Sequence, residues 1–170
     1  DFTDLGGLLE AAAELGAAVV GVNPLHALFP DTPEHASPYS PASRLFLNVL
    51  YIDVAAVPEV RASPEALTAA ETAARASRDA PLVDYARVGA LKLALLEQGY
   101  ERFEAHAERA RREAFAGFKR ERGEPLARLC RFQALREHFK AQDPERADWR
   151  RWPAEYRDYR SPAVDAFAAR

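Results

Sequence analysis

The residues best suited to bind a ligand lie between Asn23 and Asn48, where the sequence is NPLHALFPDTPEHASPYSPASRLFLN. Its prolines fix their own φ angle and favour extended conformations in the residues before them, so the segment loses little entropy when it is ordered. Within it, SPYSP holds Tyr39 between two prolines. This arrangement suits the presentation of a flat ring and a hydroxyl group to a ligand, although a tyrosine packed beneath the segment would have the same sequence.

The same segment also contains side chains of the types that bind metals, namely His26, Asp31, Glu34 and His35. A zinc site needs three or four ligands that converge tetrahedrally. The intervening prolines separate these side chains, which argues against a metal site. No other feature of the sequence indicates a cofactor.

Two apolar runs on either side of the segment are predicted to be strands that position it. Helical spacing of leucines predicts an amphipathic helix over residues 3–16, capped by Thr3 or Asp4. The run AAVVGV at 17–22 is typical of a strand buried on both faces of a parallel sheet, and VLYIDV at 49–54 is a second candidate strand. Loops after such strands bind ligands in barrels and open α/β sheets, so an α/β protein is expected.

Beyond Pro58 the pattern indicates helices with clear start signals. Ser63-Pro64 begins an alanine-rich helix that ends near Ser77, and Asp84 caps a helix that continues past Phe103. A further helix begins at Pro125, with Cys130 among its inward residues, and the last begins at Ser161-Pro162.

The tail DWRRWPAEYRDYR, residues 148–160, mixes aromatic residues with arginine and could stack on single-stranded nucleic acid. Its acidic residues Asp148, Glu155 and Asp158 neutralise it, and aromatic residues three and four positions apart favour a packing face. We predict that the tail packs and binds no nucleic acid.

Composition sets broader bounds on the 170-residue chain. A net charge of -3 argues against a general binder of nucleic acid or anionic membranes. The single cysteine cannot form an internal disulfide, and no stretch of about 18 apolar residues is present. We therefore expect a cytoplasmic protein without a membrane span. The chain has no methionine and opens on DFTDLGG, so we expect a piece of a longer polypeptide.

Three stretches carry a family resemblance: GVNPLHALFPDTPEHASPYSPASRLFLNVLYIDV, VDYARVGALKLALL and WPAEYRDYRSPAV. Together they resemble the bacterial 4-alpha-glucanotransferases, or amylomaltases, of glycoside hydrolase family 77, over essentially the whole chain. The resemblance implies a (β/α)8 TIM barrel enzyme that transfers α-1,4-glucan segments between maltooligosaccharides by a retaining mechanism. That mechanism needs a carboxylate nucleophile about 5 to 5.5 Å from a general acid/base. The family's motifs for these groups do not occur here, so no catalytic residue is assigned to this chain.

The resemblance also implies roles for parts of the chain. Residues 1–60 would form a helix-strand segment of the barrel with its substrate-lining loop, and residues 61–170 a helical insertion subdomain. Ser37 and Tyr39 would line the sugar groove, and Asn23 and His26 could hydrogen-bond sugar hydroxyls. Apart from the resemblance, we interpret Asn48 as structural, because its amide can satisfy backbone groups of the loop. The partners would be α-1,4-glucans and the rest of the barrel, and the fragment alone would be inactive. A non-catalytic helical interaction module is the alternative.

Overall fold

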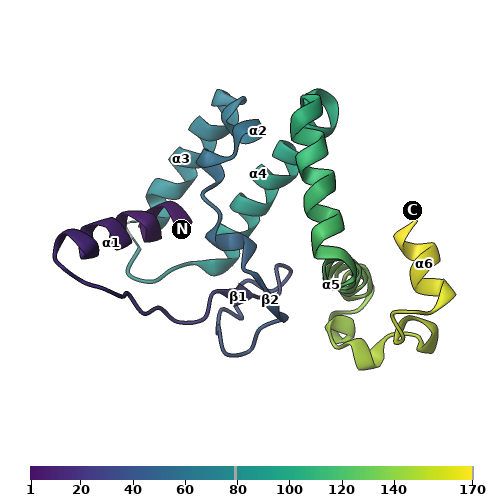
Figure 1. Ribbon diagram of the computed structural model, residues 1–170. Helices are drawn as coiled ribbons and strands as arrows, with labels where there is room; N and C mark the ends of the chain where they lie inside the picture. The colour runs from purple at the N-terminus through teal and green to yellow at the C-terminus, as the bar shows by residue number, and fades with distance from the viewer. Residues whose placement is uncertain (79, 170) are drawn as a thin grey trace. The chain divides into compact units, whose positions relative to one another are not determined.

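The computed structural model describes residues 1–78 and 80–169, without the side chains of residues 69 and 76. The chain divides into two compact units, Asp1–Glu108 and Arg109–Arg170 (Figure 1). Helices predominate, and the one sheet among the described residues has two short strands. The expected division into residues 1–60 and 61–170 rests on the family resemblance rather than on compactness, and it stays a prediction.

The first helix, α1, spans Phe2–Glu14, which confirms the helix predicted from the leucine spacing. Its cap is Asp1, whose side chain accepts hydrogen bonds from the backbone N–H groups of Thr3 and Asp4. The chain turns away at Gly16, whose φ of 86° favours glycine.

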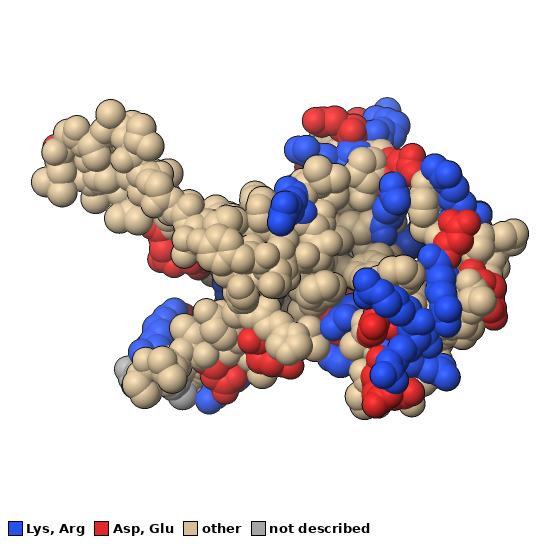
Figure 2. Space-filling view, turned by 90° about the horizontal axis from the view of Figure 1, so that it is seen from below, with Lys and Arg blue, Asp and Glu red and all other residues tan. Residues whose placement is uncertain are grey.

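The strand predicted over residues 17–22 is wrong for the described chain, which runs there without regular structure (Figure 1). Val19 is 84% exposed. On the face drawn in Figure 2, α1 and the residues that follow it, at the upper left, are almost uncharged. An apolar run forms a buried strand only where neighbouring strands and covering helices accept it, and the described residues supply neither.

The observed strands are β1, His26–Ala27, and β2, Ser43–Leu47, which pair antiparallel with an irregularity between the two positions of β1. The strand predicted over residues 49–54 is also wrong. Its place is taken by two short 3₁₀ helices, η1 (Val49–Tyr51) and η2 (Val54–Ala56).

Local side-chain capping explains why residues 49–54 do not form the predicted strand. The Asn48 side chain accepts a hydrogen bond from Leu50 N at 3.1 Å, and the Asp53 side chain accepts one from Ala55 N at 3.0 Å. Asn and Asp side chains that bind the backbone in this way compete with a strand ladder. The buried amide of Asn48 therefore has the structural role that the sequence predicted.

Three further helices complete the first unit: α2 (Pro58–Arg61), α3 (Pro64–Arg78) and α4 (Tyr85–His106). The helices predicted from Ser63-Pro64 and from Asp84 are confirmed as α3 and α4. The Asp84 side chain caps α4 by accepting a hydrogen bond from Arg87 N. Their buried faces meet in a core of Val60, Ala70 and Leu95, extended by partly buried aliphatic residues.

The second unit begins with α5, Arg109–Gln142, which is broken at Gly123, where φ is 52°. The helix predicted from Pro125 corresponds to the half after this break. Four short helices follow: η3 (Pro144–Ala147), η4 (Trp149–Arg151), η5 (Ala154–Tyr156) and α6 (Pro162–Ala168). Ser161 caps α6 as predicted. Cys130 was predicted to face inward and is exposed, whereas Leu135 and Phe139 of the same predicted stripe lie in the core.

The aromatic tail supplies the core of the second unit. Trp152 is only 2% exposed and packs between Phe132 and Phe139, with ring centroids 5.6 and 5.5 Å away. Its indole N–H donates to Arg146 O at 2.7 Å. The predicted packing face is therefore confirmed at Trp152, and on the face drawn in Figure 2 basic and acidic side chains mix over this unit, at the right. No helix within the described residues is both long and apolar enough to span a membrane.

Candidate functional site

The proline-rich loop between β1 and β2 is ordered by hydrogen bonds of its own backbone. Thr32 N donates to Phe29 O at 3.0 Å, and His35 N donates to Thr32 O at 2.9 Å. At the far end of the loop, Ala42 N donates to Ala27 O at 2.8 Å. Together with the restricted φ angles of the prolines, these bonds hold the loop in a defined conformation, as the sequence predicted.

Tyr39 lies at the outer side of this loop with its ring 68% exposed. Its hydroxyl donates a hydrogen bond of 3.0 Å to Asn23 Oδ1, across 16 positions of sequence. The alternative of a ring packed beneath the loop is therefore wrong, although the hydroxyl does have an internal partner. The structure brings together two of the predicted site residues, and the hydrogen bond restricts the orientation of an otherwise exposed ring.

The other two predicted site residues, Ser37 and His26, lie on the same hairpin as Tyr39. Ser37 is exposed, and its carbonyl oxygen accepts from Ser40 N at 3.2 Å. His26 is half-buried in β1, opposite Leu47 of β2. Among the described residues, no hydrogen bond joins either side chain to Tyr39, so their roles stay predictions.

The metal alternative finds no support in the part of the chain that the structure describes. No three or more His, Cys, Asp or Glu side chains there gather closely enough to hold a metal ion.

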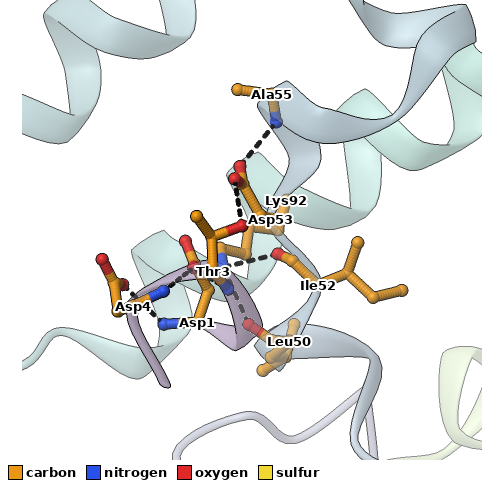
Figure 3. A network of polar contacts seen from close by, with 8 residues as sticks. All are labelled: Asp1, Thr3, Asp4, Leu50, Ile52, Asp53, Ala55 and Lys92. Atoms are coloured by element: carbon orange, nitrogen blue, oxygen red, sulfur yellow. Dashed lines mark hydrogen bonds and ion pairs between the residues drawn. The ribbon is translucent and has the colours of Figure 1, made fainter. Parts of the chain in front are cut away.

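Helix α4 contacts the back of the loop region at two positions that the sequence analysis did not select. Gly89 is buried against Pro33, and Lys92 Nζ donates to the carbonyl oxygens of Leu50 and Ile52 at 2.8 and 2.9 Å (Figure 3). A helical lysine is usually assigned to solvent. The available signal was its place one position after Leu91, on the edge of the apolar stripe of α4.

A cavity of about 470 Å³ opens between α3, α4 and residues 81–83. Apolar side chains of both helices line it, and Asp53 and Lys92 contribute polar groups. None of the predicted site residues lines this cavity. It is therefore separate from the exposed Tyr39.

Comparison with known proteins identifies the family. The family model of glycoside hydrolase family 77, described as 4-alpha-glucanotransferase, matches residues 1–170. A 4-alpha-glucanotransferase of Haemophilus influenzae is 37% identical over an alignment 167 residues long, which covers 92% of this chain and 24% of that protein. The 4-alpha-glucanotransferases of Mycobacterium bovis and Mycobacterium tuberculosis are 32% identical to it over alignments of the same length, which cover 92% of this chain and 22% of each of those proteins.

The chain therefore belongs to the 4-alpha-glucanotransferases of glycoside hydrolase family 77. It spans about a quarter of the length of the curated relatives that it matches. The family match does not favour the alternative of a non-catalytic interaction module.

Proposed function

We propose that this chain is one segment of a longer 4-alpha-glucanotransferase and contributes part of the groove that binds its α-1,4-glucan substrate. The reaction cleaves an α-1,4 bond of a maltooligosaccharide and transfers the freed glucanyl unit to the 4-hydroxyl of another sugar. We infer a retaining mechanism, with a carboxylate nucleophile and a general acid/base about 5 to 5.5 Å apart. Both carboxylates belong to the part of the enzyme beyond this chain, and the chain alone is inactive. The family match and the share of the relatives that it covers support this proposal.

The exposed ring of Tyr39 is the observation that carries the binding role. A large aromatic surface in water is unfavourable unless something packs on it, and pyranose rings offer C–H faces that do so. The hydrogen bond from its hydroxyl to Asn23 limits the directions in which the ring can point. The ring is therefore oriented in advance for a sugar, which reduces the ordering cost of binding.

Polar groups beside the ring would then read the sugar hydroxyls. Because Asn23 Oδ1 accepts from Tyr39, its Nδ2 group remains available as a donor. The hydroxyl of exposed Ser37 can both donate and accept, and half-buried His26 can supply one ring nitrogen. Few oriented polar groups around an apolar face are typical of small-molecule sites.

The apolar residues 17–22 support the expectation of a barrel around this chain. All of them except the half-buried Val20 are exposed, in a segment without regular structure, yet their composition suits a strand with neighbours on both sides. We propose that other strands of a (β/α)8 barrel pair with this segment, so that the rest of the barrel is a partner of the chain. The cytoplasmic location suggested by the single cysteine belongs to the same proposal.

Glucose release from maltotriose tests the proposed function in the longer protein. Tyr39→Ala should raise the KM for maltotriose strongly, and Tyr39→Phe, which keeps the ring and loses the bond to Asn23, should raise it less. Tyr100→Ala is the matched control, because Tyr100 is 52% exposed but stacks on Phe103 of its own helix. Unchanged KM in Tyr39→Ala would contradict the binding role, and glucose release by the isolated chain would contradict our placement of the carboxylates.

A further inference from the structure

The close approach of α4 to the loop depends on Gly89. A Cβ atom at this position would lie 2.9 Å from both Cβ and Cγ of Pro33, a distance that real Cβ contacts essentially never show. The ring of Pro33 is rigid and cannot rotate away as a long side chain would. The helix backbone therefore supports the loop directly, in a way that any larger residue would disturb.

Lys92 lies three residues further along α4, on the same face of the helix. Its Nζ atom donates to Leu50 O at 2.8 Å and to Ile52 O at 2.9 Å, in the segment that follows β2 (Figure 3). Burial lowers the pKa of this ammonium group, while the carboxylates of Asp53 and Asp4 act in the opposite direction. A lysine desolvated in this way interacts with fixed backbone oxygens rather than with bulk water.

The start of α1 joins the same network. Thr3 Oγ1 donates to Asp53 Oδ2 at 2.7 Å, and the other carboxylate oxygen of Asp53 caps η2 through Ala55 N (Figure 3). The segment from β2 to η2 is thus held from α4 on one side and from α1 on the other.

These contacts connect to Tyr39 through the hairpin. Asn48 N, just before η1, donates to Leu25 O at 3.0 Å, which ties the segment held by Lys92 to the start of β1. Pro33 lies six residues before Tyr39 in the same loop. The base of the hairpin and Pro33 are therefore held against α4, and these contacts constrain where the loop carries Tyr39.

We propose that Gly89 and Lys92 are positioning residues that set where α4 holds the glucan-binding loop and its Tyr39 ring. This inference rests on the proposed function of the loop. Neither residue touches the sugar. Each acts through the backbone of the loop region, Gly89 through Pro33 and Lys92 through the carbonyl oxygens after β2.

A matched control separates positioning from general damage to the helix. Gly99 lies on the same helix, is also buried, and a Cβ atom there would lie 2.9 Å from Val60 Cγ2. Gly89→Ala and Gly99→Ala are thus the same substitution with the same closeness of contact. They differ in the neighbour, which is the loop for Gly89 and α2 for Gly99.

The test measures KM and kcat for maltotriose, together with the melting temperature, in the longer protein. Gly89→Ala should raise KM about tenfold, which corresponds to a loss of about 1.4 kcal/mol of substrate binding free energy at the displaced loop. The kcat value should change little, because a displaced binding surface weakens substrate binding in the ground and transition states alike. Gly99→Ala should lower the melting temperature comparably and leave KM near that of the unsubstituted protein.

Two further variants keep the proposal falsifiable if Gly89→Ala folds poorly. Pro33→Gly removes both atoms that the new methyl group would meet, so Gly89→Ala in that background should have the KM of Pro33→Gly alone. Lys92→Met, which keeps the length but not the donors, should raise KM, and Lys92→Arg should restore it in part.

The outcomes distinguish this inference from the proposed function. A KM change in Gly89→Ala no larger than in Gly99→Ala, while Tyr39→Ala raises KM, would overturn the positioning role alone. An unchanged KM in Tyr39→Ala would overturn both. A KM that rises in Gly89→Ala and recovers in the Pro33→Gly background would support the inference.

Discussion

The loop at residues 28–42 and the tail at residues 143–161 are similar in composition, but Tyr39 of the loop is exposed and Trp152 of the tail is buried. Both lack long helices and strands, both contain prolines, and in both an aromatic side chain, Tyr39 or Trp152, donates a hydrogen bond from its polar group. In the loop the Tyr39 ring is exposed, whereas in the tail the Trp152 ring is buried. Proline and aromatic content therefore do not decide whether such a segment forms a binding surface or a core.

The difference comes from what each segment packs against. The tail folds over α5 and α6, where Trp152 joins Leu135, Phe139 and the fully buried Val164 in one cluster. The loop places small or inward residues such as Leu28 and Thr32 in its interior and leaves Tyr39 outside. A hydrophobic stripe at helical spacing accepts the aromatic residue of the tail, and among the described residues no such stripe covers the exposed Tyr39.

The largest effect that would sharpen this comparison is expected from Trp152→Ala. Loss of a fully buried aromatic ring should lower the free energy of unfolding by about 3–5 kcal/mol, because a cavity remains where the ring contacted Phe132 and Phe139. Urea denaturation followed by far-ultraviolet circular dichroism measures this change. Trp149→Ala is the control, since Trp149 is 41% exposed and its loss should cost far less. Equal effects would show that burial is not what distinguishes the two segments.

A second prediction concerns the break in α5 at Gly123. Gly123 has φ 52° and ψ -139°, a conformation open essentially to glycine alone, so Gly123→Ala should destabilise the chain by about 1–3 kcal/mol. Gly117 lies in the regular part of the same helix with ordinary contacts, and Gly117→Ala should stabilise by about 0.5–1 kcal/mol. Thermal denaturation shows whether each variant melts below or above the unsubstituted protein. If Gly123→Ala stabilised the chain instead, the break at Gly123 would not be required, and α5 could continue as one regular helix through this position.

Local signals predicted the helices well. The side chains of Asp84 and Ser161 cap α4 and α6 as expected, and the prolines at 64 and 162 occupy first helical positions. The strands failed because their formation depends on distant partners. Residues 17–22 have the composition of a buried strand, but no sheet among the described residues accepts them.

The site could be predicted only in part for the same reason. The prolines around Tyr39 and the loop itself are visible in the sequence, so an ordered loop was predictable. The hydrogen bond between Tyr39 and Asn23 joins residues 16 positions apart, and no local pattern indicates it. Lys92 was missed because a lysine in a helix normally extends into water, and only the fold brings the carbonyl oxygens after β2 to it.

A smaller effect is expected at Asn48, the buried polar residue at the end of β2. Its side chain caps η1, so Asn48→Ala should lower the free energy of unfolding by about 1 kcal/mol, with up to about 2 kcal/mol possible for a buried cap. Asn48→Asp keeps the accepting oxygen and should cost less. The denaturant midpoints of Asn48→Ala and Asn48→Asp measure how much stability each variant loses. If both lose the same stability, the hydrogen bond to Leu50 N is not what the amide contributes.

The smallest effect on stability is expected where the largest effect on binding is proposed. Tyr39→Ala removes an exposed ring with one hydrogen bond to an exposed partner, so the free energy of unfolding should change by no more than about 0.5 kcal/mol. The same variant should lose most of its affinity for maltooligosaccharides, measured by titration calorimetry on the longer protein. The reverse is expected for a core residue such as Trp152: its replacement should lower the free energy of unfolding strongly and should weaken binding only because more of the protein is unfolded. A Tyr39→Ala variant that lost several kcal/mol would place this ring with Trp152 among the residues that hold the fold, and its exposure would need another explanation.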